Sequence, residues 1–293
     1  MCLRLGLLAT GALALSGCIS FRSTSVVASF GQLVGSRAAA VAMFPTFCEA
    51  ENIFAGTQPT CPVDQIQRFA DELTSCSQLI SRYSTTLRNV AEFNDPRPSD
   101  ELNQALQGLG RAGEILYPHD DRSGRLLASA AGQVTAILSQ GWRRDKIEKL
   151  VESTHPHLLV LLDGMLGRVK LLSESARYAV TDGLSQQSRM LQDVDAAPNA
   201  TPDPLGRRQR QAERVALLHF QMTARRSYDA LVAYQRALLA FQQAHTILFE
   251  FVTRHQNGLA DDGEMYELLK KTIPPILSPP TANPAIPNPA IPK

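Results

Sequence analysis

Histidines are the residues of this 293-residue chain best suited to chemistry. His155 and His157 flank Pro156, and a His-x-His pair can bind a metal ion through its imidazole nitrogens. A metal site usually needs three or four ligands, and only Glu152 and Asp163 lie near this pair in sequence. We therefore predict no metal here and interpret the segment as the first turn of a helix.

Other motifs with catalytic potential are incomplete. His245 lies on the apolar stripe of a predicted helix, which indicates a hydrogen-bonded core residue rather than a ligand. Gly108-x-Gly110-x-x-Gly113 has dinucleotide-loop spacing, but it lies inside a leucine-striped helix instead of following a strand. The Glu-x-x-His pair of di-iron bundles occurs once, and no Gly-x-Ser-x-Gly nucleophile motif occurs. We predict no catalytic residue, no metal, no cofactor and no small-molecule substrate.

The elements that would position these residues are helices throughout, because apolar residues recur at helical spacing and no stretch alternates with period two. The first helix is predicted from about Val26 to Phe44, and the second begins at Pro62. Further helices are predicted between 99 and 152. The second helix carries a coiled-coil-like stripe: Ile66, Phe69, Leu73, Cys76, Ile80, Tyr83, Leu87 and Val90.

Two long helices, at about 156–195 and 205–257, are predicted to form an antiparallel hairpin. Folding the chain back near residue 200 places residue i opposite roughly 400−i. A short helix follows from Asp262 to Lys271. The inward-facing residues of the second long helix are predicted to be Leu217, Phe220, Ala224, Ser227, Leu231, Tyr234, Leu238, Phe241, His245, Leu248 and Val252.

The predicted fold is an all-α, elongated helical bundle. An N-terminal bundle over 26–152 is expected to pack as one domain with the hairpin and short helix over 153–272. Residues 273–293 contain the pentapeptide Asn-Pro-Ala-Ile-Pro twice in succession. A proline-rich segment of this kind cannot hold a helix or a sheet, so we predict a disordered C-terminal tail.

The N-terminus has a basic residue, Arg4, a short apolar run and small residues before a cysteine. This is the pattern of a secretory signal, and the run is too short to span a bilayer. Leu15-Ser16-Gly17-Cys18 resembles the lipobox of bacterial lipoproteins. The resemblance implies removal of residues 1–17, a diacylglycerol on the Cys18 sulfur and an N-acyl group. Residues 18–25 would then be a lipidated tether, and Ile19, which is not Asp, implies the outer membrane, facing the periplasm.

Three cysteines remain after Cys2 is removed with the signal and Cys18 is lipidated. Cys48 and Cys61 flank a loop between two helices, and an exported chain enters a compartment where disulfides persist. We predict a Cys48–Cys61 disulfide and a buried thiol at Cys76; the alternative is that all three thiols stay free.

Charge limits the classes of partner. The chain has 29 Lys and Arg, of which Arg4 leaves with the signal, against 28 Asp and Glu. This balance argues against nucleic acid. The start of the second long helix is nonetheless basic, which is unfavourable to the helix dipole. The cluster consists of Arg207, Arg208, Arg210 and Arg214. It is either a solvated face or a patch that contacts lipid headgroups or an acidic partner.

These features favour a non-catalytic, lipid-anchored envelope protein that binds other periplasmic or membrane proteins through its helical surface. One alternative is an immunity or inhibitor lipoprotein that neutralises a toxin or a lysozyme-like enzyme. Another is an envelope hydrolase with an unrecognised site.

Overall fold

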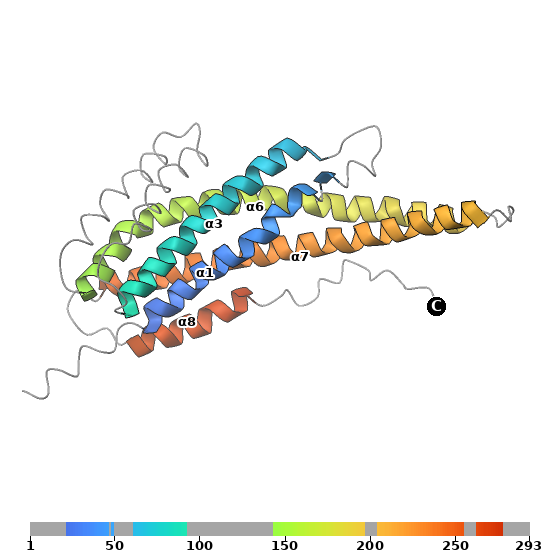
Figure 1. The fold of residues 1–293 in the computed structure, drawn as a ribbon. Coiled ribbons are helices and arrows are strands. Elements are labelled where there is room, and N and C mark those ends of the chain that lie inside the picture. The colour runs from blue at the N-terminus through green and yellow to red at the C-terminus, as the bar shows by residue number, and fades with distance from the viewer. Residues whose placement is uncertain are drawn as a thin grey trace, which may run out of the picture.

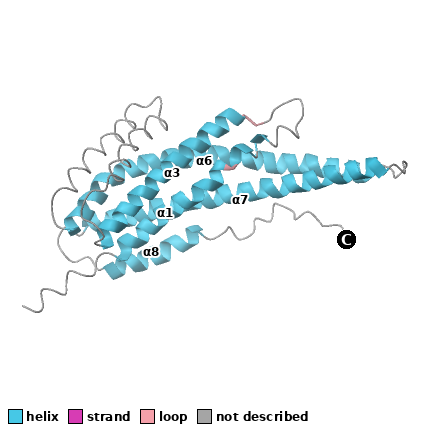
Figure 2. Ribbon diagram, viewed as in Figure 1, coloured by secondary structure: helices cyan, strands magenta, loops and turns pink. Residues whose placement is uncertain are grey.

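The computed structural model describes residues 22–46, 48–49, 61–92, 143–196, 204–254 and 262–277. These residues form an all-α bundle without a strand, as Figure 2 shows. Its five helices are α1 (Arg22–Ala42), α3 (Val63–Glu92), α6 (Arg143–Ala196), α7 (Pro204–Arg254) and α8 (Asp262–Leu277) (Figure 1). The prediction of an all-α, elongated bundle is confirmed.

Helices α6 and α7 are the long antiparallel pair, with 54 and 51 residues. At 1.5 Å per residue each extends for about 80 Å. His155 contacts His245, and Gln242 donates a hydrogen bond to Asp163, so the predicted register near 400−i is confirmed. All eleven predicted inward residues of α7, from Leu217 to Val252, are buried.

Helix α7 is central to the bundle, because α1, α6 and α8 all pack against it. Helices α1 and α3 cross very closely. A Cβ atom added to Gly31 would collide with the Ser84 side chain and lie 2.9 Å from Phe241, and one added to Gly35 would lie 2.7 Å from Cβ of Ser81. The spacing Gly31-x-x-x-Gly35 therefore permits the contact between the two backbones.

The predicted helix boundary near residue 154 is wrong. Helix α6 begins at Arg143 and continues through Pro156, so the predicted domain limit at 152/153 falls inside it. Thr154 does not cap a helix here, because its buried hydroxyl donates to the Leu150 carbonyl one turn earlier. Burial of residues on both sides of the proline, such as Leu150 and Leu158, outweighs the local cost of proline in a helix interior.

Two other predicted limits also need correction. Helix α1 begins at Arg22, so 22–25 of the predicted tether are helical, and Ser23 and Thr24 are buried. Helix α8 continues to Leu277 through Pro274 and Pro275, so the first residues of the predicted tail over 273–293 are also helical. Burial of Ile273 and the packing of Ile276 and Leu277 on the core account for this extension.

Within the described part of the chain, one segment, Arg22–Thr46, is long and apolar enough to cross a membrane by length and composition. The core helix of a soluble bundle meets the same criteria. In this fold Val27, Val34 and Val41 of that segment are fully buried against neighbouring helices. The helices predicted between 99 and 141 and the rest of the tail lie outside the described residues.

Candidate functional site

A buried polar cluster joins the three helices α3, α6 and α7. Tyr83 of α3 places its hydroxyl 2.8 Å from Nε2 of His245 and 3.0 Å from Oγ1 of Thr154. His155, next to Thr154 on α6, places Nδ1 3.0 Å from Nδ1 of His245. All four side chains are nearly inaccessible to water.

One arrangement of hydrogens provides a proton for every contact in this cluster. Because the Thr154 hydroxyl donates to the Leu150 carbonyl at 2.7 Å, its oxygen is left to accept from Tyr83. Tyr83 must then accept from Nε2–H of His245, whose unprotonated Nδ1 accepts from Nδ1–H of His155. The hydrogen bonds thus run in one direction, from His155 to the backbone of α6.

Burial controls the protonation of the cluster. Burial, followed by the proximity of His155, lowers the pKa of His245 to about 3. The pKa of His155 is also lowered by burial, and Glu250 opposes that change. Burial raises the pKa of Tyr83, against the effect of its hydrogen bond to Thr154. At neutral pH both histidines are therefore uncharged, as the hydrogen-bond arrangement requires.

Aromatic rings complete the surroundings of the two histidines. The His155 ring stacks on Phe249 with centroids 4.0 Å apart and lies parallel to the His245 ring at 5.3 Å. Phe241 makes a tilted contact with His245 on another side. These rings hold the imidazoles in place and exclude water, which makes the cluster a buried connection between helices.

His157 lies apart from this connection. It is buried, burial lowers its pKa, and its Nδ1 has no hydrogen-bond partner among the described residues. The predicted helix-start role of His155 and His157 is wrong, since both lie inside α6. No group of three or more His, Cys, Asp or Glu able to hold a metal occurs within the described ranges.

Other polar contacts tie α3 to its neighbours. The Tyr234 hydroxyl lies 2.6 Å from Oγ of Ser77, and Arg168 forms a half-buried salt bridge of 2.6 Å with Glu72. Cys76 lies on this side of α3 as a buried free thiol, as predicted. Burial raises its pKa to about 12, so it is not a thiolate at neutral pH and lacks nucleophilic character.

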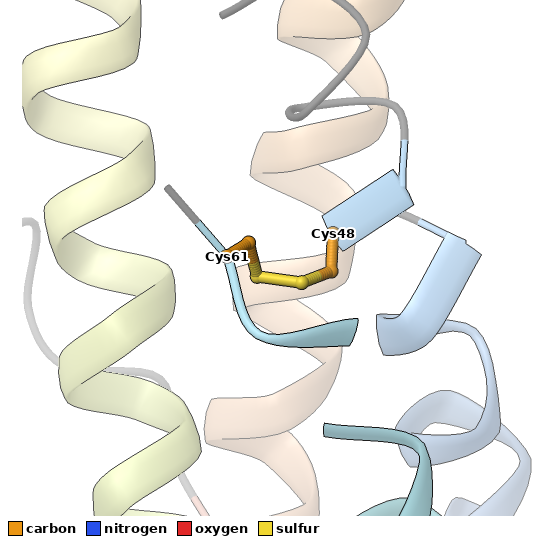
Figure 3. The surroundings of a disulfide bond; sticks show 2 residues. All are labelled: Cys48 and Cys61. Carbon is orange, nitrogen blue, oxygen red and sulfur yellow. A yellow bond between two sulfur atoms is a disulfide. The ribbon is translucent and has the colours of Figure 1, made fainter. Parts of the chain in front are cut away.

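The predicted Cys48–Cys61 disulfide is confirmed. Figure 3 shows the bond joining the segment that follows α1 to the residue shortly before α3. The two Cα atoms are 5.5 Å apart and both cysteines are buried. The bond therefore closes the loop between α1 and α3 at the end of their close crossing.

The predicted arginine patch lies at the start of α7, where Arg208 and Arg214 are exposed. Arg207 and Arg210 belong to the same helix, but their side chains are outside the described set. Sequence reasoning missed the apolar side chains exposed beside them, Val215, Leu218 and Met222. These three residues are spaced by three and four positions, which is a helical apolar pattern visible in the sequence. It was overlooked because the buried stripe of the same helix has the same kind of spacing.

The lipidation residue Cys18 lies outside the described residues. No protein-family model, curated protein or solved structure matches this chain. A functional interpretation therefore rests on the residues and their geometry alone.

Proposed function

We propose that this protein is a lipid-anchored, non-catalytic scaffold of the bacterial outer membrane that faces the periplasm and binds other envelope proteins through its helical surface. The supporting observation is the arm, which we define as 204–226 of α7 with the part of α6 beside it. The arm projects beyond α1, α3 and α8 (Figure 1). A projecting pair of long helices offers a partner a surface on more than one side and requires no cavity.

The N-terminus supports the anchor. Leu15-Ser16-Gly17-Cys18 has the lipobox pattern, and α1 begins at Arg22, only four residues after Cys18. At about 3.4 Å per residue that distance is at most about 15 Å. The start of α1 would therefore stay close to the leaflet that holds the lipid. The long bundle would allow its other end to contact partners farther from the anchor.

Mass spectrometry of the mature protein tests the anchor. We expect cleavage before Cys18 and a mass increase equal to a diacylglycerol and an N-acyl group. Cys18→Ala should lose that increase, whereas Cys76→Ala, which changes a buried free cysteine, should retain it. An unmodified Cys18 in the wild-type chain would refute the anchor.

Crosslinking in intact cells with a tagged full-length chain tests the scaffold. We expect several envelope proteins to be captured; capture of none would refute the scaffold. A single one-to-one complex with a toxin or lysozyme-like enzyme would instead establish the inhibitor alternative. Turnover of wall or lipid substrates, abolished by one polar substitution, would establish the hydrolase and refute the scaffold.

A further inference from the structure

One face of the arm exposes a continuous apolar stripe. Val215, Leu218 and Met222 are 60%, 44% and 55% exposed, and their spacing of three and four residues aligns them along the helix. Leu217 and Phe220, which lie between them in sequence, are buried, and α6 packs along α7. At 3.6 residues per turn the stripe lies nearly opposite these buried residues, so it points away from α6.

Arginines border this stripe on both sides. Helical geometry places Arg214 and Arg225 along one edge and Arg208 and Arg226 along the other, and all four are exposed. Between 205 and 226 the sequence contains six arginines and one acidic residue, Glu213. Glu213 lies nearer the buried side of the helix and accepts a hydrogen bond from Gln209. We call the stripe together with its four exposed arginines the arm face.

The size and charge of the arm face distinguish among possible occupants. From Arg208 to Arg226 it extends for about 27 Å, and a helix about 10 Å wide then offers about 300 Å². A stable protein interface buries about 800 Å² on each partner. A second copy of the same face would also bring arginines close to arginines. An anionic lipid surface meets neither obstacle, because it needs no matched shape and attracts basic amphipathic helices.

We propose that the arm face binds an anionic phospholipid surface. The apolar stripe would enter the boundary between headgroups and acyl chains, and the arginines would hydrogen-bond lipid phosphates, which a guanidinium can do with two N–H groups at once. The stripe points away from α6, so the α6 side of the arm remains available to the protein partners of the proposed scaffold.

The arm face lies far from the start of α1. Arg22 donates a hydrogen bond of 3.3 Å to the Tyr266 hydroxyl of α8, at the end of the molecule opposite the arm (Figure 1). Attachment through Cys18 at one end and through the arm face at the other gives two separate points of contact. The molecule then lies along the membrane instead of standing upright on it.

A fluorescent label at the centre of the arm face tests this proposal. The full-length Leu218→Cys protein is labelled with an environment-sensitive dye and bound to vesicles of phosphatidylcholine with or without phosphatidylglycerol. The native disulfide and the buried Cys76 do not compete for the dye, Cys2 leaves with the signal, and the sulfur of a lipidated Cys18 is not a free thiol. With phosphatidylglycerol, the emission should shift to the blue and be quenched by acyl-brominated lipids, and added salt should reverse both effects.

Two controls make the result specific. A label at Leu171→Cys, an apolar position on α6 that is 53% exposed against 44% for Leu218, should stay in water in both vesicles. Arg214→Glu together with Arg225→Glu should abolish the response at residue 218 while helix content by circular dichroism stays unchanged. A conservative pair, Arg214→Lys and Arg225→Lys, should retain most of it.

Three outcomes would overturn the proposal: a label that remains in water on anionic vesicles, equal burial on neutral vesicles, or charge reversal without effect. A blue shift without any lipid would also overturn it, because a protein surface would then cover the arm face. An unlipidated Cys18 would refute the anchor but not the arm face, because vesicles can be added to the unlipidated chain, with Cys18→Ala to keep the dye at residue 218, and the same response measured.

Discussion

Acidification should destabilise the fold through His245. Its pKa is about 3 in the folded protein, against about 6.5 for an unperturbed histidine. The folded state keeps the ring neutral while the unfolded chain takes up a proton below about pH 6.5. Because the folded pKa is the lower one, stability is full above the unfolded pKa and falls as the pH drops toward the folded pKa.

The magnitude follows from linkage. Between about pH 7.5 and about pH 5, the unfolded His245 gains almost a full proton and the folded one gains none, which reduces the free energy of unfolding by about 2 kcal/mol. His155 acts in the same direction, because its pKa is also lowered. For a chain of this size the melting temperature should fall by about 4–8 °C from His245 alone.

Urea unfolding followed by circular dichroism at several pH values measures this effect. His245→Gln should lose about 1–3 kcal/mol at neutral pH, because the hydrogen bond that His245 donates to Tyr83 and the one it accepts from His155 are disturbed, and its pH dependence should be weaker. His219→Gln changes an exposed histidine on the same helix and should leave the wild-type profile unchanged. A wild-type profile that is flat over this range, or equal slopes for wild type and His245→Gln, would refute the reasoning.

Two further substitutions test the packing. Removing the disulfide by Cys48→Ser and Cys61→Ser should lower the free energy of unfolding by about 3 kcal/mol, since the bond closes a loop with a sequence separation of 13; an unchanged urea midpoint in non-reducing buffer would contradict this. Gly31→Ala should cost about 1–3 kcal/mol, because the new methyl group collides with Ser84. Gly167→Ala, where no atom lies within 4 Å of the added Cβ, should instead stabilise α6 by up to about 1 kcal/mol. Equal melting temperatures for the two glycine variants would show that the α1–α3 crossing can adapt.

Apolar periodicity predicted the fold well because each buried stripe is a local property of one helix. The stripe of α7 from Leu217 to Val252 is buried throughout, and so are most of the positions predicted on α3. Helix boundaries were harder, because Pro156 is a strong local signal of a helix start. The favourable energy that outweighs this signal comes from the packing of α6 against other helices. The sequence of one segment does not show which helices it packs against.

The buried polar cluster could be predicted in part from the sequence. The predicted register near 400−i places His155 opposite His245, and the structure confirms the pairing. The predicted helix start near this position made His155 a first-turn residue at the end of the hairpin, which obscured the pairing. Tyr83 could not be assigned in this way, because the position of α3 relative to the hairpin depends on crossings such as the one at Gly31.

The position of the polar cluster along α6 has a physical reason. Pro156 lacks the N–H that would bond to the carbonyl one turn earlier, and the Thr154 hydroxyl shares the Leu150 carbonyl with the helix backbone. Both features weaken this turn of α6. The hydrogen bond that Thr154 accepts from Tyr83 and the one that His155 donates to His245 supply, through neighbouring helices, part of the support that the backbone lacks here. Protonation of the histidines therefore acts where α6 depends most on its neighbours, and acid-induced opening should begin at this turn.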